Sequence, residues 1–156
     1  MLLKWIVLLL FSTSLTLAQS TRNPERAQLS KRRPHSASKV RSVKELSNLI
    51  KNLRAKGATV GITNEKVSQP FFSVAARIIN VNGESVQVFE YARASAADTE
   101  ANRVSSSGDT VGTSKPSWMA PPHFFKNGKF IVLYVGANES ILKVLKTSLG
   151  VQFAGA

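Results

Sequence analysis

His123 is the residue best suited to acid–base chemistry, because the only other histidine, His35, lies in a basic N-terminal stretch. A histidine general base needs a nucleophile within hydrogen-bond reach and an acidic group that orients the ring. Ser114 or Ser117 with Glu90 would supply these roles, but no spacing in the sequence brings them together. A histidine beside two prolines and two phenylalanines is more often a packing residue at a strand edge. We therefore expect no enzymatic activity, and the alternative is an unrecognised hydrolase or inhibitor-like domain that uses His123.

The composition argues against several other chemistries. The chain of 156 residues contains no cysteine, which excludes disulfides, thiolate catalysis and cysteine-ligated metals. Two histidines do not make a multi-histidine metal site, and no acidic residues are paired as in glycosidase or metal sites. P-loop, dinucleotide-binding, G-x-S-x-G and H-E-x-x-H motifs are absent from the sequence. We expect neither a metal nor a cofactor.

Aromatic residues around a proline-stiffened connector form a second kind of candidate site. The group consists of Phe71, Phe72, Trp118, Met119, Phe124 and Phe125, with His123 beside it. Aromatic side chains on rigid loops make ready contact surfaces for peptides or small apolar ligands. On this basis Trp118, His123, Phe124 and Phe72 are candidate ligand-binding residues. The alternative, which the pattern favours, is that these side chains seal one end of the core.

The charge of the chain is uneven. Lys and Arg number 21 against 9 Asp and Glu, which gives a net charge of +12, and Gln19–Arg41 holds seven of the basic residues and one acid. This segment has few apolar residues, so we expect a disordered linker. Lys31, Arg32 and Arg33 are candidate contacts for a polyanion such as anionic lipid or polysaccharide, with nucleic acid less expected. The alternative, a solvated spacer, is favoured.

The first 20 residues have the three-part pattern of a secretory signal. Lys4 precedes the apolar run Trp5–Phe11, and small residues follow up to Ala18. We expect cleavage after Ala18, with cleavage after Ser20 as the alternative. A membrane anchor is the other possibility, but the apolar run is shorter than the roughly 20 residues that a spanning helix needs. The sequence thus predicts an exported protein, periplasmic or extracellular, with no transmembrane helix in its mature form.

Residues 42–156 are predicted to form a single α+β domain. Ser42 and Glu45 have the spacing of a capping box, and Asn82-Gly83 and Asn127-Gly128 are hairpin signals. Helices are expected at 42–57, 95–104 and 138–150, and strands at 59–63, 72–81, 85–91, 110–118, 123–125 and 130–135. The order α-β-β-β-α-β-β-β-α predicts a two-layer sandwich in which the helices cover one face of an antiparallel sheet.

Two segments of the domain have a similar pattern. Each begins with a hairpin turn, continues with a strand that reaches Tyr91 or Tyr134, and is followed by a helix. The pattern indicates a degenerate repeat or, equally, two hairpins that use the same turn chemistry. Phe130–Val135 is apolar throughout, which is typical of a central strand buried on both faces.

Several segments of the domain are similar to a family of uncharacterised bacterial secreted proteins and lipoproteins. They are Val67–Phe72, Val81–Glu84, Val86–Tyr91, Ala120–Phe124, Ile131–Gly136 and Leu149–Gly155. The resemblance implies a location in the bacterial envelope and implies no activity. Many such proteins carry a lipid-bearing cysteine after the signal, which this sequence lacks. Together, these features predict an exported module that binds a partner without catalysis, and the partner is an envelope protein, an anionic lipid or a polysaccharide.

Overall fold

The computed structural model describes residues 34–156, with side chains from Ser42 onward, and Arg41–Ala156 forms one compact unit. The described elements are α2 (Pro34–Ala55), β1 (Val60–Val67), β2 (Ala76–Val81), β3 (Glu84–Glu90), α3 (Ala94–Ala101), β4 (Pro122–Asn127), β5 (Phe130–Val135), α4 (Glu139–Leu149) and β6 (Gln152–Gly155). They confirm the α+β class. The expected signal and Lys31, Arg32 and Arg33 lie outside the described residues. Over residues 34–156, no helix combines the length and apolar character needed to cross a membrane.

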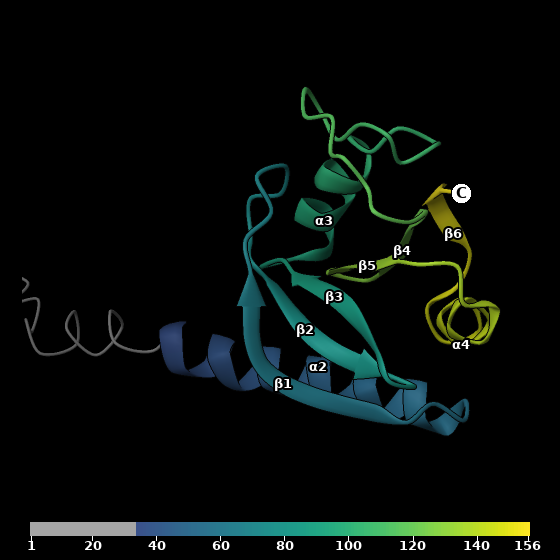
Figure 1. The fold of residues 1–156 in the computed structure, drawn as a ribbon. Coiled ribbons are helices and arrows are strands. Elements are labelled where there is room, and N and C mark those ends of the chain that lie inside the picture. Colours follow the sequence, from purple (N-terminus) through teal and green to yellow (C-terminus); the bar gives the residue numbers. More distant parts are fainter. Residues whose placement is uncertain (1–33) are drawn as a thin grey trace, which may run out of the picture. The chain divides into compact units, whose positions relative to one another are not determined.

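The strands form one antiparallel sheet in the order β1-β2-β3-β5-β4-β6 (Figure 1). Asn82 and Gly83, at φ 51° and 92°, make the expected turn between β2 and β3. In the second hairpin Asn127 still pairs with Phe130, so the turn residues are Gly128 and Lys129, one position later than expected. β5 lies between β3 and β4 and is buried on both faces, as predicted.

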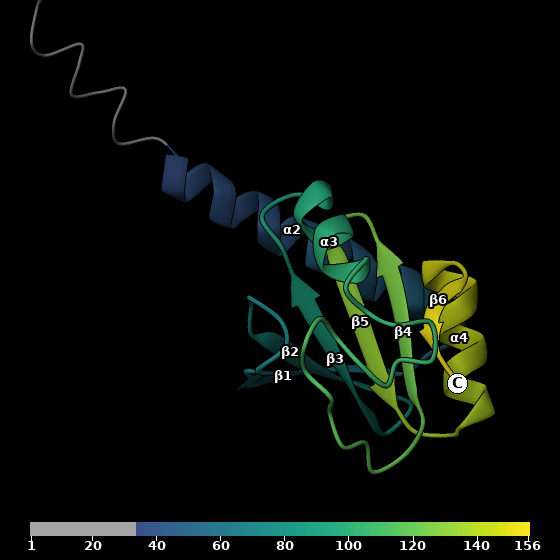
Figure 2. The same ribbon diagram turned by 90° about the horizontal axis from the view of Figure 1, so that it is seen from above.

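Helices cover both faces of the sheet, so the expected arrangement with every helix on one face is wrong. From Arg41 onward α2 packs with α4 on one face, where Leu53, Val86 and Leu145 are buried. α3 packs on the other face, where Ala97 contacts the cluster that contains Phe89. The views of Figures 1 and 2 agree, since α3 lies on the opposite side of the sheet from α2. Adjacent strand residues face opposite ways, so each strand contributes to both clusters.

The first helix begins at Pro34, eight residues before the expected start at Ser42. The end of the predicted linker is therefore helical, and the rest of that linker lies outside the described residues. The capping-box prediction is wrong: the Ser42 hydroxyl donates to Oε1 of Glu90 on β3, and Glu45 forms an ion pair with Lys129. Two polar residues that matched a local cap instead connect the helix to the sheet.

The predicted element order also fails near its end. Residues 110–118 form a loop with isolated bridges at Val111, and no strand lies there. The sixth strand is instead β6, after α4, where Phe124 pairs with Ala154. Gly150, at φ 101°, ends α4 and lets the chain turn back toward the sheet. β6 has only four residues and directly follows a helix, so its pattern of apolar and polar residues does not predict a strand. Only the pairing with β4 makes it one.

Candidate functional site

A cluster of aromatic rings lies on the α3 face of the sheet. Phe71 is 5.7 Å from Trp118 and 5.1 Å from Phe72, measured between ring centroids, and all these contacts are edge-to-face. Phe72 and Trp118 also contact Phe124, at 6.4 Å and 6.0 Å. Phe71, Phe72 and Phe124 are buried, whereas Trp118 is half-buried. The three phenylalanines therefore act as core residues, and Trp118 extends the cluster to the surface.

The loop before β4 is held so that Trp118 keeps this position. Its indole Nε1 donates to the carbonyl oxygen of Gly108 at 3.0 Å. Gly108 has φ 74°, and a Cβ there would lie 3.1 Å from the ring of Phe124. A glycine is thus needed for the positive φ and for the short distance to the ring of Phe124. Its carbonyl oxygen, in turn, holds the indole of Trp118 against the aromatic cluster.

Next to Trp118 the surface is hollowed into a groove of about 480 Å³. Its apolar wall consists of the half-buried Trp118 and the edge of Phe71, which is 4% exposed, and the fully exposed Met119 also lines it. Gln69 and Gln87 add a polar strip, in which Nε2 of Gln69 donates to Oε1 of Gln87 at 2.9 Å. The volume lies in the range of small-molecule and peptide sites.

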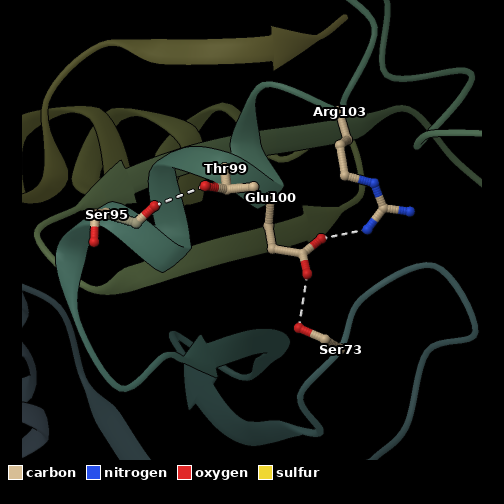
Figure 3. A network of polar contacts seen from close by, with 5 residues as sticks. All are labelled: Ser73, Ser95, Thr99, Glu100 and Arg103. Atoms are coloured by element: carbon tan, nitrogen blue, oxygen red, sulfur yellow. Dashed lines mark hydrogen bonds and ion pairs between the residues drawn. The ribbon is translucent and has the colours of Figure 1, made fainter.

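A carboxylate on α3 fixes the loop that carries the phenylalanines (Figure 3). The Ser73 hydroxyl donates to Oε1 of Glu100 at 2.7 Å, and Arg103 forms an ion pair with Oε2 at 2.5 Å. Ser73 directly follows Phe72, so Glu100 ties the aromatic segment to the helix. The Glu100 side chain is only 12% exposed, so water weakens its ion pair with Arg103 less than it would weaken a fully solvated pair.

His123 lies on the opposite face of the sheet from Trp118, although Phe124 is its neighbour in sequence. Its ring is 5% exposed and stacks on Tyr134, with 6.0 Å between ring centroids. Nδ1 lies 3.0 Å from Oε1 of Gln152, and Nε2 lies 3.0 Å from the carbonyl oxygen of Gly136. Both ring nitrogens are thus engaged in hydrogen bonds, one with Gln152 at the start of β6 and one with Gly136 directly after β5.

The candidate base is therefore not assembled with its expected partners. Ser114 and Ser117 line the groove on the other face, and Glu90 accepts from Ser42 and pairs with Lys129. Of the four expected ligand-binding residues, only Trp118 lines the groove. The sequence did not indicate Gln69 and Gln87, because their pairing depends on the register that brings β3 beside the loop before β2.

A second, more polar hollow of about 350 Å³ lies where the sheet meets α2. Lys66, Arg77 and Glu90 line it, with Ser42 and the side chain of Leu46 from the helix. Lys129 lies 2.7 Å from Glu90 and 2.5 Å from Glu45. Burial alone would lower the pKa of Lys129, but its hydrogen bonds to these two carboxylates raise it overall.

No protein-family model, curated protein or solved structure gives a significant match to this chain. Among the described residues no three acidic or histidine side chains gather as a set of metal ligands. Function is therefore inferred from the groove beside Trp118, the hollow beneath α2 and the sequence patterns.

Proposed function

We propose that this chain is an exported, non-enzymatic binding module that holds an extended, apolar segment of a partner protein in the groove beside Trp118. The observation that carries the proposal is the apolar wall of Phe71 and Trp118, with Met119 fully exposed at its edge. Aromatic residues and methionine are the side chains enriched at protein interfaces. A flexible methionine also adapts to different partner side chains.

The polar strip of the groove favours a peptide over a purely apolar ligand. Gln69 and Gln87 use one amide atom each in their mutual hydrogen bond. Within the described part of the chain, Oε1 of Gln69 and Nε2 of Gln87 have no hydrogen-bond partner. This leaves one acceptor and one donor beside the aromatic wall, which is what the N–H and C=O of a peptide unit require.

Export and location belong to the same proposal. The N-terminal pattern supports secretion with cleavage after Ala18, and the family resemblance supports an envelope partner. Mass spectrometry of the secreted protein should show a chain that begins at Gln19. Recovery of the uncleaved chain in the membrane fraction would instead favour an N-terminal anchor.

Trp118 offers a direct test of the groove. The chain has two tryptophans, Trp5 and Trp118, so in the mature protein that begins at Gln19 the tryptophan fluorescence comes from Trp118 alone. Peptides selected from a displayed library against the immobilised protein should shift this fluorescence on binding. Met119→Asp should weaken them about tenfold or more, because it places a charge beside the apolar wall without disturbing the core.

Val151→Asp is the matched control, since Val151 is also exposed (80%) but lies at the α4–β6 side of the molecule. It should leave the affinity of the selected peptides unchanged. Peptides that bind equally to the parent and Met119→Asp proteins would contradict the proposed groove. Binding of small apolar probes with no selectable peptide would contradict the proposed partner class.

Polyanion contact by Lys31, Arg32 and Arg33 is a separate, accessory part of the proposal. Exposed charges are screened over about 10 Å at ~0.1 M salt. Binding to heparin or to vesicles of anionic lipid should therefore fall steeply with salt, and replacement of all three residues by glutamine should remove most of it. Salt-resistant binding that survives the triple replacement would contradict this role.

A further inference from the structure

Two positive side chains face each other across neighbouring strands at the polar hollow beneath α2. Lys66 on β1 is directly opposite Arg77 on β2. Directly opposed residues of an antiparallel pair share one face of the sheet, and like charges in this position are destabilising. An anion bound beside the pair would offset this repulsion.

The register of the sheet creates this pair. Val60 and Ile62 pair with Val81 and Ile79, and the register then shifts before Lys66. The shift is a bulge held by the Thr63 hydroxyl, which donates to the carbonyl oxygen of Ile78 at 2.8 Å. Bulges commonly re-aim side chains near functional sites. Here the bulge places a lysine opposite the arginine.

The carboxylate that lines the hollow interacts with other residues. Glu90 lines the same hollow, but its Oε1 accepts from Ser42 and lies 2.7 Å from Nζ of Lys129. Among the described residues, neither Lys66 nor Arg77 makes a hydrogen bond or an ion pair through its side chain. Arg77 is half-buried, so water screens its charge less than that of a fully exposed arginine.

We propose that this hollow binds a small phosphate monoester, with Arg77 and Lys66 on the phosphate. A phosphate monoester carries a charge near −2, which matches the two cations. The planar guanidinium of Arg77 can hold two phosphate oxygens at once. A volume of about 350 Å³ leaves room for an organic group, and Leu46, Ala75 and Val88 provide an apolar wall for it.

The test uses the full-length chain and three probes: inorganic phosphate, phenyl phosphate and benzoate. A ligand that binds only the folded state raises the melting temperature. At matched ionic strength phenyl phosphate should raise it more than sodium chloride does, and should bind more tightly than benzoate in calorimetric titration. Arg77→Gln and Lys66→Gln should each reduce its affinity about tenfold or more.

The same two variants report on the unliganded protein. Each removes a like-charge contact, so neither should lower the melting temperature without phosphate. Arg93→Gln is the matched control, because Arg93 is exposed and its side chain makes no cap hydrogen bond. It should retain full affinity, as should the triple glutamine variant of Lys31, Arg32 and Arg33.

Four results would overturn the assignment. Stabilisation by phenyl phosphate that only equals the effect of chloride would show that the hollow selects no anion. Unchanged binding by Arg77→Gln, or loss of binding in the triple arm variant, would place the anion elsewhere. Benzoate that binds as tightly as phenyl phosphate would show that the site does not select phosphate.

Discussion

The hairpin β2–β3 with α3 and the hairpin β4–β5 with α4 are built alike, yet their helices cover opposite faces of the sheet (Figure 1). α3 is short and contributes Ala97 and Ala101 to its core cluster. α4 buries Ile141, Leu145 and Leu149. The same order of elements thus supports two different kinds of packing.

The two helices differ in the size of the side chains that they bury, although both faces of the sheet carry rings. Phe72, Phe89 and Phe124 lie on the α3 face. Phe125, Phe130 and Tyr134 lie with valines on the α4 face. Interiors are packed to nearly constant density, so the alanines of α3 let it lie close to its face, and the leucines of α4 fill more space on the other.

Truncation in α4 should have the largest effect. Leu145 is fully buried, so Leu145→Ala leaves a cavity and should lower the free energy of unfolding by about 2–5 kcal/mol. Chemical denaturation monitored by circular dichroism measures this loss. Lys143→Ala, on an exposed position of the same helix, is the control and should change stability little. An equally small change for both variants would contradict the packing of α4.

Enlargement in α3 should destabilise by the opposite mechanism. Ala97 is fully buried against the aromatic cluster, so Ala97→Leu overpacks that face and should cost about 1–3 kcal/mol. Ser95→Leu, on an exposed position of α3, serves as the control in the same denaturation experiment. A gain in stability for Ala97→Leu would show that the α3 face has unfilled space.

The two helices should also differ in their dependence on N-terminal caps. Asn138 caps α4 by accepting from the backbone N–H of Ser140 at 3.0 Å, as predicted, whereas Arg93 makes no side-chain cap for α3. Asn138→Ala should therefore cost about 1 kcal/mol in thermal denaturation, and Arg93→Ala should cost close to nothing. Equal losses of stability in the two variants would contradict this difference between α4 and α3.

The tyrosine near the end of the second strand of each hairpin offers a smaller comparison. The Tyr134 hydroxyl donates to Oε2 of Glu84 at 2.5 Å, whereas the buried Tyr91 hydroxyl has no partner among the described residues. Burial raises the pKa of Tyr91. Tyr91→Phe should raise the free energy of unfolding by up to about 1 kcal/mol, because it removes an unsatisfied polar group. Tyr134→Phe should lower the free energy of unfolding. A lower free energy of unfolding for both variants would contradict the proposed difference between the two hydroxyls.

The smallest expected effect depends on pH. Hydrogen bonds from Tyr134 and then Asn138 hold the pKa of Glu84 below its ordinary value of 4.5. A carboxylate with a lowered pKa stabilises the fold above the unfolded pKa and loses that contribution as pH falls through the folded pKa. Below pH 4.5 the melting temperature of Glu84→Gln should therefore decrease less with falling pH than that of the parent protein. Glu65→Gln, at an exposed position of β1, is the control for the loss of one carboxylate.

Local signals in the sequence predicted most individual elements of the domain. Glycines at the hairpin turns, the Asn138 cap and the continuous apolar run of β5 all have causes within a few residues. The Ser42–Glu45 pattern failed because both side chains found stronger partners, Glu90 and Lys129, far away in sequence. A local motif holds only where no long-range contact competes for its polar groups.

The candidate sites could be predicted only in part. Trp118 and the apolar character of its surroundings were evident from the sequence, but the rings of Phe72 and Phe124 are buried behind it. His123 and Phe124 were grouped as neighbours, and strand alternation sends them to opposite faces. The cross-strand pair of Lys66 and Arg77 depends on a bulge, which no local residue pattern indicated.

The sequence by itself determined the helices, the hairpins and the expected export pattern, because turn chemistry, caps and apolar periodicity act over a few residues. Tertiary structure alone decided which face each helix covers, where the sixth strand pairs and which polar groups meet. Those outcomes depend on filling space and matching charges between segments far apart in the chain. That is why α3 and α4 lie on opposite faces, and why Lys66 and Arg77 face one another.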